Sequence, residues 1–308
     1  MAENPVAERA LPQALAWLAD APLFIDADLV GRFYDAIISP EYHEGPTKLE
    51  LTSEAAKRIG GQLGIEAKVA VSGVKKWLAS LLPSLDVSFK ASGQGSMELT
   101  EGESESLEIT LHRIDTPQRR LVQLAIHYVI NHGERLLILQ NTAKEAWPDN
   151  AEIVQVPRAL AFVDLAPGTK IIPTAAEFAD GVVMPLYLSL LGPNGEDPPK
   201  YPEAGSPADL SQARKKYWAW FSENVTPSMA MRVVEKASTE KGRIRWIDYR
   251  VMLTSEGDTA HLHVCPAGNY DTGVLAYNLV KRAEKHGVRI VGTLKSEPDI
   301  NVMALYEK

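Results

Sequence analysis

The sequence predicts an α+β protein of two domains, with mixed or antiparallel sheets and helices packed on them. At 308 residues the chain exceeds the roughly 100–200 residues of one domain. Apolar residues at strand spacing alternate along the chain with apolar residues at helical spacing, which is typical of this class. Eight of the sixteen residues of 192–207 are glycine or proline, which disfavours both helix and strand. We therefore predict an acidic N-terminal α+β domain at 1–191, a linker or long surface loop at 192–207, and a C-terminal α+β sandwich domain at 208–308. The alternative for 192–207 is a lid over a site.

In the N-terminal part, helices are predicted where apolar residues recur every three or four positions. Leucines at this spacing indicate a helix over Val6–Ala19, and a broad apolar face indicates another over 29–38. Thr116 followed by Pro117 is a helix start, and this helix is predicted to end at Gly133. The other predicted elements are strands at 23–26, 63–71, 85–89, 135–139 and 153–165 and a short helix at 74–82.

Residues 23–34 read Leu-Phe-Ile-Asp-Ala-Asp-Leu-Val-Gly-Arg-Phe-Tyr, a short strand that ends in aspartate and leads into a helix. This stretch resembles the opening of uncharacterised bacterial cytosolic proteins, some of which occur near antiphage defence genes. The resemblance is confined to these residues. It implies a bacterial cytosolic origin and a setting in antiphage defence or a stress response.

The C-terminal part is predicted from its cap, turn and stop signals. Ser206 and Asp209 form a helix start, and Gly287 is a helix stop that favours a left-handed backbone. Ser255–Asp258 indicates a four-residue hairpin loop. The predicted elements are helices at 208–224 and from 271 or 272 to 286, and strands at 229–235, 243–253, 259–265, 288–294 and 300–306.

The charge distribution and the motifs bear on the class of function. Residues 1–207 carry 17 basic and 28 acidic side chains, whereas residues 208–308 carry 15 and 12. An acidic first part makes nucleic acid an unlikely partner, because phosphate binding needs clustered positive charge. The sequence contains no glycine-rich phosphate loop, no dinucleotide-binding pattern and no Gly-x-Ser-x-Gly elbow. We therefore predict no catalytic residues and no cofactor, and a non-enzymatic binding or sensing protein with a protein partner.

Three further observations bear on localisation. The longest apolar run, 181–192, contains a proline and is shorter than the roughly 20 residues of a membrane helix. The N-terminus is acidic where a secretory signal would be basic. The single cysteine, Cys265, excludes an intrachain disulfide and a four-cysteine zinc site. These observations predict a cytoplasmic protein without a transmembrane segment, in which Cys265 is a buried structural thiol.

The strongest candidate site lies on the predicted hairpin at 243–265. If its loop pairs Thr254 with Thr259, one face of the two strands is apolar and points to the core. The core-facing residues would be Tyr249, Val251, Leu262 and Val264. The opposite face would carry Asp248, Arg250, His261, His263 and Cys265.

Three interpretations of this polar face are open. Its aspartate, arginine and two histidines can bind an anionic ligand. Its two histidines and its cysteine can instead hold a metal ion, which would make the chain a metal-binding protein or an enzyme that uses His261 and His263. The third interpretation is the solvated side of an antiparallel sheet, which is polar by rule.

A second candidate is the run of interleaved basic and aromatic residues at 214–221. Such a run is found where proteins bind single-stranded nucleic acid. On a helix, however, Trp218 falls within an aromatic stripe that is typical of a core, and Trp220 lies at its edge. We therefore predict that Trp218 is buried in the core. The alternatives are that the run binds a protein partner through Arg214, Lys215 and Trp220, or that it binds nucleic acid.

His127 and His132 lie on the predicted helix that begins at Thr116. Their separation of five positions predicts that the two rings do not share a face of the helix. A helical zinc site prefers a separation of four with an adjacent glutamate, so we expect polar residues at the margin of the helix.

Overall fold

The computed structural model describes residues 16–38, 47–51, 87–91, 107–111, 116–132, 135–140, 159–253, 258–266, 270–294 and 299–308. The strand predicted at 63–71, the helix predicted at 74–82 and most of the helix predicted over Val6–Ala19 lie outside these residues. Contacts divide the chain into two compact units. Unit 1 comprises 1–21 and 27–138, and unit 2 comprises 22–26 and 139–308.

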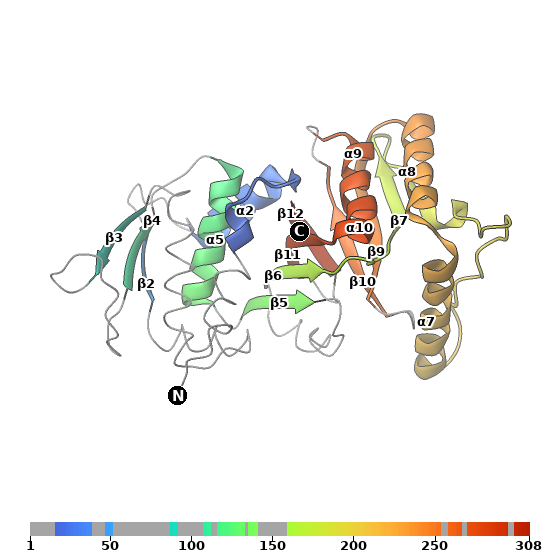
Figure 1. Cartoon of the computed structure of the whole chain (residues 1–308), viewed down its shortest axis with the longest axis horizontal. Coiled ribbons are helices and arrows are strands. Elements are labelled where there is room, and N and C mark those ends of the chain that lie inside the picture. The colour runs from blue at the N-terminus through green and yellow to red at the C-terminus, as the bar shows by residue number, and fades with distance from the viewer. Residues whose placement is uncertain are drawn as a thin grey trace. The chain divides into compact units, whose positions relative to one another are not determined.

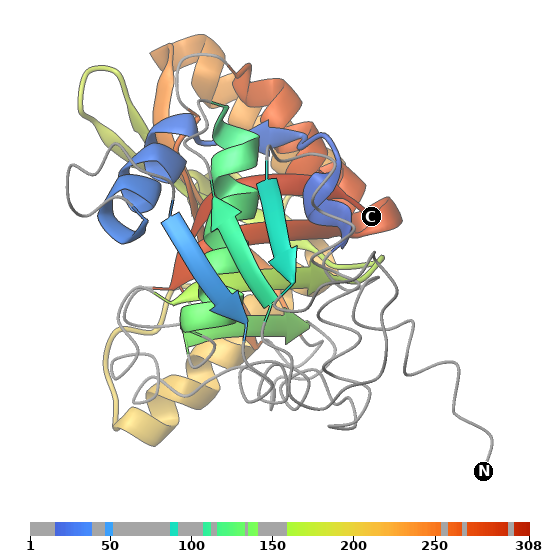
Figure 2. The same cartoon turned by 90° about the vertical axis from the view of Figure 1, so that its left-hand side faces the viewer.

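Unit 1 combines helices with a three-stranded antiparallel sheet. The short 3₁₀ helix η1 spans Ala16–Ala19, α2 spans Ala27–Ile37, and α5 spans Pro117–Asn131 after the predicted start at Thr116. Helices α2 and α5 are in contact, and the Tyr34 hydroxyl donates a buried hydrogen bond to Gln123 Oε1 at 2.6 Å. The sheet, seen in Figure 2, consists of β2 (Thr47–Leu51), β4 (Leu107–Leu111) and β3 (Val87–Ala91) in that order.

The rings of His127 and His132 lie against each other, with their centroids 5.3 Å apart. The prediction that they point in different directions was wrong, because α5 ends at Asn131. His132 is the C-cap with a non-helical backbone (φ −133°, ψ 39°), so its ring turns back toward the last turn of the helix. Burial, together with the neighbouring His132, lowers the pKa of His127 to about 4.

This lowered pKa predicts an acid-dependent loss of stability. The folded pKa of His127 lies below the usual value near 6.5, so the unfolded chain binds the proton more tightly. Stability is therefore fully present above pH 6.5 and falls as the pH drops toward 4, by up to about 3 kcal/mol from this group. Urea unfolding of the native chain and of His127→Gln at pH 7 and pH 4.5 measures the effect. Equal pH dependence of the two proteins would contradict the prediction.

Unit 2 contains most of a large mixed sheet with the strand order β5-β6-β11-β12-β10-β9-β7-β8, and β1 pairs in addition with β12 (Figure 1). The pair β10–β12 is parallel, whereas the other pairs with a determined register are antiparallel. This sheet and its helices confirm the predicted α+β class. The strands are β1 (Phe24–Ile25), β5 (Leu136–Gln140), β6 (Leu160–Leu165), β7 (Ile171–Phe178), β8 (Val183–Pro185), β9 (Ile244–Met252), β10 (Thr259–Val264), β11 (Val288–Leu294) and β12 (Asp299–Glu307).

Strand β12 holds the middle of this sheet together. Along one edge it pairs with β11 over nearly its whole length. Its other edge is shared by two strands, because β10 pairs with residues 299–301 and β1 pairs with residues 304–305. The last strand of the sequence therefore joins elements from both ends of the chain.

The helices of unit 2 are α7 (Pro207–Asn224), α8 (Pro227–Lys241) and a continuous helix of three parts, namely α9 (Thr272–Ala276), the π-helical turn η6 (Tyr277–Lys281) and α10 (Arg282–His286). Helix α8 lies beside α9 and η6, and both α8 and η6 contact β7 (Figure 1). Among the described residues, no helix has the length and apolar character needed to cross a membrane.

The strand predicted at 229–235 was wrong, since these residues belong to α8. The Thr226 side chain accepts a hydrogen bond from the Met229 backbone, and Pro227 occupies the first turn, which is the same start signal that was recognised for α5. The buried residues Ala230, Val234 and Ala237 recur at i, i+4 and i+7, which is helical spacing.

The glycine- and proline-rich segment forms neither helix nor strand from residue 192 to Ser206, as predicted. It does not separate two compact units, however, which differs from the predicted boundary at 192–207. Strand β7 before the segment pairs with β9 after it, and both belong to unit 2. The local composition predicts a loop at these residues. The pairing of β7 with β9 places that loop within unit 2.

Candidate functional site

The candidate site lies on the hairpin formed by β9 and β10. In the structure Thr259 pairs with Met252 and His263 pairs with Asp248. The predicted pairing of Thr259 with Thr254 was therefore wrong by two residues. Because side chains alternate between faces with a period of two, a shift of two leaves every side chain on its predicted face.

The two faces of the hairpin have the predicted character. The side chains of Tyr249, Val251, Leu262 and Val264 are buried. Those of the opposite face are partly exposed, and they are Asp248, Arg250, His261, His263 and Cys265. The shift changes only which residues are cross-strand neighbours. In the structure His261 faces Arg250, and His263 faces Asp248.

Asp248 binds both histidines. Its Oδ1 lies 2.7 Å from His263 Nδ1, and its Oδ2 lies 3.2 Å from His261 Nε2. Burial alone would raise the pKa of Asp248, but the hydrogen bonds from the two histidines outweigh it and lower the pKa to about 2. The hydrogen bond to Asp248, and next the one to Cys265, raise the pKa of His263 to about 9. At neutral pH the pair is therefore a carboxylate and an imidazolium.

Cys265 is partly exposed, so the prediction of a buried structural thiol was wrong. It follows the end of β10 on the same face as His263, and its Sγ lies 3.4 Å from His263 Nε2. The other ring nitrogen of His263 is the one bound to Asp248. The side chains thus form a line of thiol, imidazole and carboxylate, which is the order found where a base oriented by an acid activates a nucleophile.

The described residues contain no group of three or more His, Cys, Asp or Glu side chains placed to hold a metal ion. His261 and His263 each turn a ring nitrogen toward Asp248, and the second nitrogen of His263 faces Cys265. The structure therefore does not bring His261, His263 and Cys265 into the metal-ligand arrangement that was considered from the sequence.

Several neighbours of this cluster were not identified from the sequence. The ring of Trp246 lies tilted against that of His263 with the ring centroids 5.4 Å apart, and its Nε1 donates a hydrogen bond to Glu177 of β7. Asn301 of β12 pairs with His263 across the parallel ladder, and the side-chain oxygen of Asn301 is buried without a hydrogen-bond partner in the described residues. Trp246 lies on β9 itself, whereas Glu177 and Asn301 come from β7 and β12, whose pairing with the hairpin no local pattern predicts.

Helix α7 borders the same face through Trp218, because the Arg250 guanidinium lies 5.5 Å from the centre of the Trp218 ring. The predicted burial of Trp218 is confirmed, with 8% of the side chain exposed. Lys215 forms an ion pair of 3.0 Å with Asp258, and the exposed Arg214 lies over the ring of Tyr201 at 5.5 Å. A partner at Arg214, Lys215 and Trp220 stays a prediction.

Chemically, the arrangement keeps a protonated imidazole next to the thiol of a partly exposed cysteine. The thiolate is the nucleophilic form of a cysteine. Comparison of the chain with protein-family models, with curated protein sequences and with solved structures found no match.

Proposed function

We propose that the chain is a non-enzymatic sensing protein whose reactive group is the Cys265 thiol, with His263 and Asp248 holding an imidazolium against it. The observation that carries the proposal is the line Cys265 Sγ to His263 Nε2 (3.4 Å) and His263 Nδ1 to Asp248 Oδ1 (2.7 Å). Partial exposure of Cys265 gives small molecules access to the sulfur.

The reaction we propose is oxidation by a small peroxide. The thiolate sulfur attacks one peroxide oxygen, the O–O bond breaks, and the imidazolium proton passes to the leaving hydroxide to give water. Sulfur loses two electrons and becomes a sulfenic acid, while the peroxide gains them. Because Cys265 is the only cysteine, the chain has no thiol of its own to complete an intrachain disulfide. A small external thiol then forms a mixed disulfide with release of water, which makes the response reversible.

This chemistry fits the setting that the resemblance of residues 23–34 implies. In the bacterial cytoplasm, reducing conditions keep a lone thiol reduced until an oxidant arrives. A stress response would read the oxidation state of Cys265, and α7, which borders the site, would present it to a protein partner. The exposed Arg214 and the half-buried Trp220 are the residues that we assign to that contact.

The rate of alkylation of Cys265 by iodoacetamide, followed by mass spectrometry, tests the proposal. We expect His263→Gln and Asp248→Asn to react at least about tenfold more slowly than the native chain at pH 7, because the first removes the imidazole and the second removes the carboxylate that keeps it charged. His261→Gln is the matched control: His261 also contacts Asp248, and its loss leaves the pair of His263 and Asp248 in place. We expect this variant to react at nearly the native rate.

The pH profile separates an electrostatic role of His263 from a structural one. The pKa of His263 is raised to about 9, so the ring carries its proton below that pH and loses it above. The advantage of the native chain over His263→Gln should therefore shrink as the pH rises through 9. Equal rates at pH 7, or a ratio unchanged above pH 10, would contradict the proposal, and repeated turnover of an activated ester would favour an enzyme instead.

A second candidate function is binding of a small anion at the same face, using the predicted residues Asp248, Arg250, His261 and His263. The cross-strand pairing of Arg250 with His261, beside the His263 imidazolium, favours this candidate. Titration with inorganic phosphate, monitored by calorimetry, tests it. Arg250→Gln should abolish phosphate binding and Cys265→Ser should retain it, which distinguishes this function from the thiol.

A further inference from the structure

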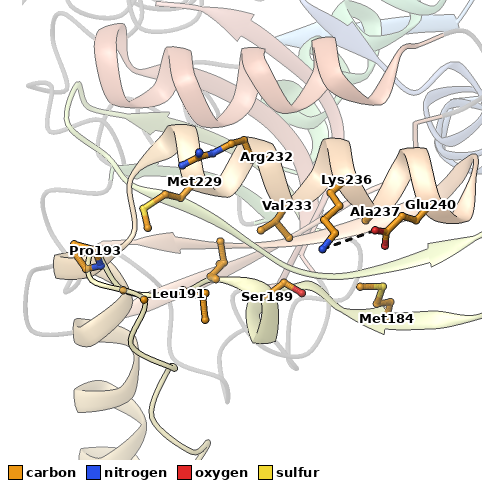
Figure 3. A pocket seen from close by; sticks show the side chains of 13 residues that line it. Met184, Ser189, Leu191, Pro193, Met229, Arg232, Val233, Lys236, Ala237 and Glu240 are labelled. Atoms are coloured by element: carbon orange, nitrogen blue, oxygen red, sulfur yellow. Dashed lines mark ion pairs between the residues drawn. The ribbon is translucent and has the colours of Figure 1, made fainter.

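A separate cavity lies in unit 2 between α8 and the segment 184–195 (Figure 3). Its volume is about 410 Å³, which is within the range of small-molecule sites. None of its lining residues belongs to the hairpin site of β9 and β10. This cavity is therefore independent of the proposed thiol function.

The floor of the cavity is apolar. Helix α8 contributes Met229, Val233 and Ala237, which recur every four residues and so form one stripe. Met184 and Leu191 line it from the facing segment, and Leu191 is 42% exposed. Methionine side chains adapt their shape to irregular apolar partners, and two of them border this space. An apolar group placed here would remove that surface from water.

The rim of the cavity is charged and carries an excess of positive charge. Arg232, Lys236 and Glu240 form a second stripe on α8, beside the apolar one (Figure 3). Lys236 Nζ pairs with Glu240 Oε1 at 3.8 Å. Arg232 has no ion-pair partner among the residues that the structure describes. Arg232 is thus the lining residue whose charge is available to an anion.

We propose that this cavity binds a small amphipathic monocarboxylate, with its apolar body on the stripe of Met229 and Val233 and its carboxylate on Arg232. A planar guanidinium presents paired donors that match the two oxygens of a carboxylate. The apolar floor supplies affinity through burial, and the Arg232 guanidinium selects the charge of the head group. The volume, at the lower end of the range for ligand sites, selects a short ligand.

Calorimetric titration of the full chain with decanoate tests the proposal, with decanol and decyltrimethylammonium as ligands of the same chain length. We expect decanoate to bind at least about tenfold more tightly than either, because only decanoate supplies the negative charge. Absence of decanoate binding, or equal affinity for decanol, would overturn the proposal.

Variants of α8 locate the site. Arg232→Gln should weaken decanoate binding by about tenfold or more. Lys241→Gln removes an exposed cation from the end of the same helix, outside the cavity, and should leave the affinity unchanged. Val233→Glu places a carboxylate on the half-buried floor and should abolish binding while the chain stays folded, as judged by its thermal midpoint.

Two outcomes would overturn the assignment. Native affinity in Arg232→Gln would show that the carboxylate does not lie on this guanidinium. Sedimentation tests whether a second copy of the chain occupies the cavity instead. That occupant would be shown if the native chain is a dimer, if decanoate leaves the dimer intact, and if Val233→Glu dissociates it.

Discussion

Replacement of Trp218 by alanine is expected to lower the free energy of unfolding by about 3–5 kcal/mol, because it empties a large buried volume. Trp218 is 8% exposed and lies against Tyr217 and Phe221, with ring centroids 5.0 and 5.5 Å away. It also lies under the Arg250 guanidinium, so its loss removes contacts from the sheet as well as from the helix. Thermal and urea unfolding of the variant measure the effect.

Trp220→Ala is the matched control for this prediction. Trp220 is on the same helix and contacts Phe221 at 5.1 Å, but it is only partly buried. We expect a loss of about 1–2 kcal/mol, since a partly exposed side chain leaves no closed cavity. A Trp218→Ala midpoint equal to that of the native chain would refute the core assignment and make α7 the leading interaction surface.

Gly287→Ala is expected to lower the free energy of unfolding by about 4 kcal/mol, from two contributions of roughly 1–3 kcal/mol each. The first is backbone strain, since Gly287 has φ 80° and ψ 169°, a region that is essentially restricted to glycine. The second is a collision, because a Cβ at this position would lie 2.3 Å from the Leu165 carbonyl oxygen. Urea unfolding gives the total.

Gly242→Ala separates the two contributions. Gly242 ends α8 as Gly287 ends α10, with φ 82° and ψ −149°, but a Cβ there would have no neighbour within 4 Å. Only the strain of about 1–3 kcal/mol should therefore appear. Equal losses in the two variants would mean that the contact with Leu165 is relieved by a local shift of the chain.

Strand and helix ends with strong local signals were predictable from the sequence. The start of α5 at Thr116 and Pro117, and the positive φ of Gly287, depend on chemistry within one or two residues. Helix α8 has the same Thr-Pro start, yet its mixture of methionine, alanine and valine also allowed a strand. The hydrogen bond that the Thr226 side chain accepts at the helix start, and the packing of α8 against β7, favour the helix.

The candidate site was predictable in its composition but not in its contacts. Alternation alone placed Asp248, His263 and Cys265 on one face, and that placement is insensitive to a shift of two residues. The contact between His263 and Asp248 depends on the hairpin register, which the loop composition did not determine. Asn301 joins the site only because β12 pairs in parallel with β10, a long-range contact that no local pattern encodes.

The position of β12 has a consequence for the order of events during synthesis. β10, β11 and β1 all pair with this strand, so a growing chain exposes three unpaired strand edges until residues 299–307 have left the ribosome. Unpaired edges of this kind recruit other chains. The nascent protein is therefore vulnerable to aggregation until β12 can pair with these strands, and this is the stage at which a chaperone would protect it.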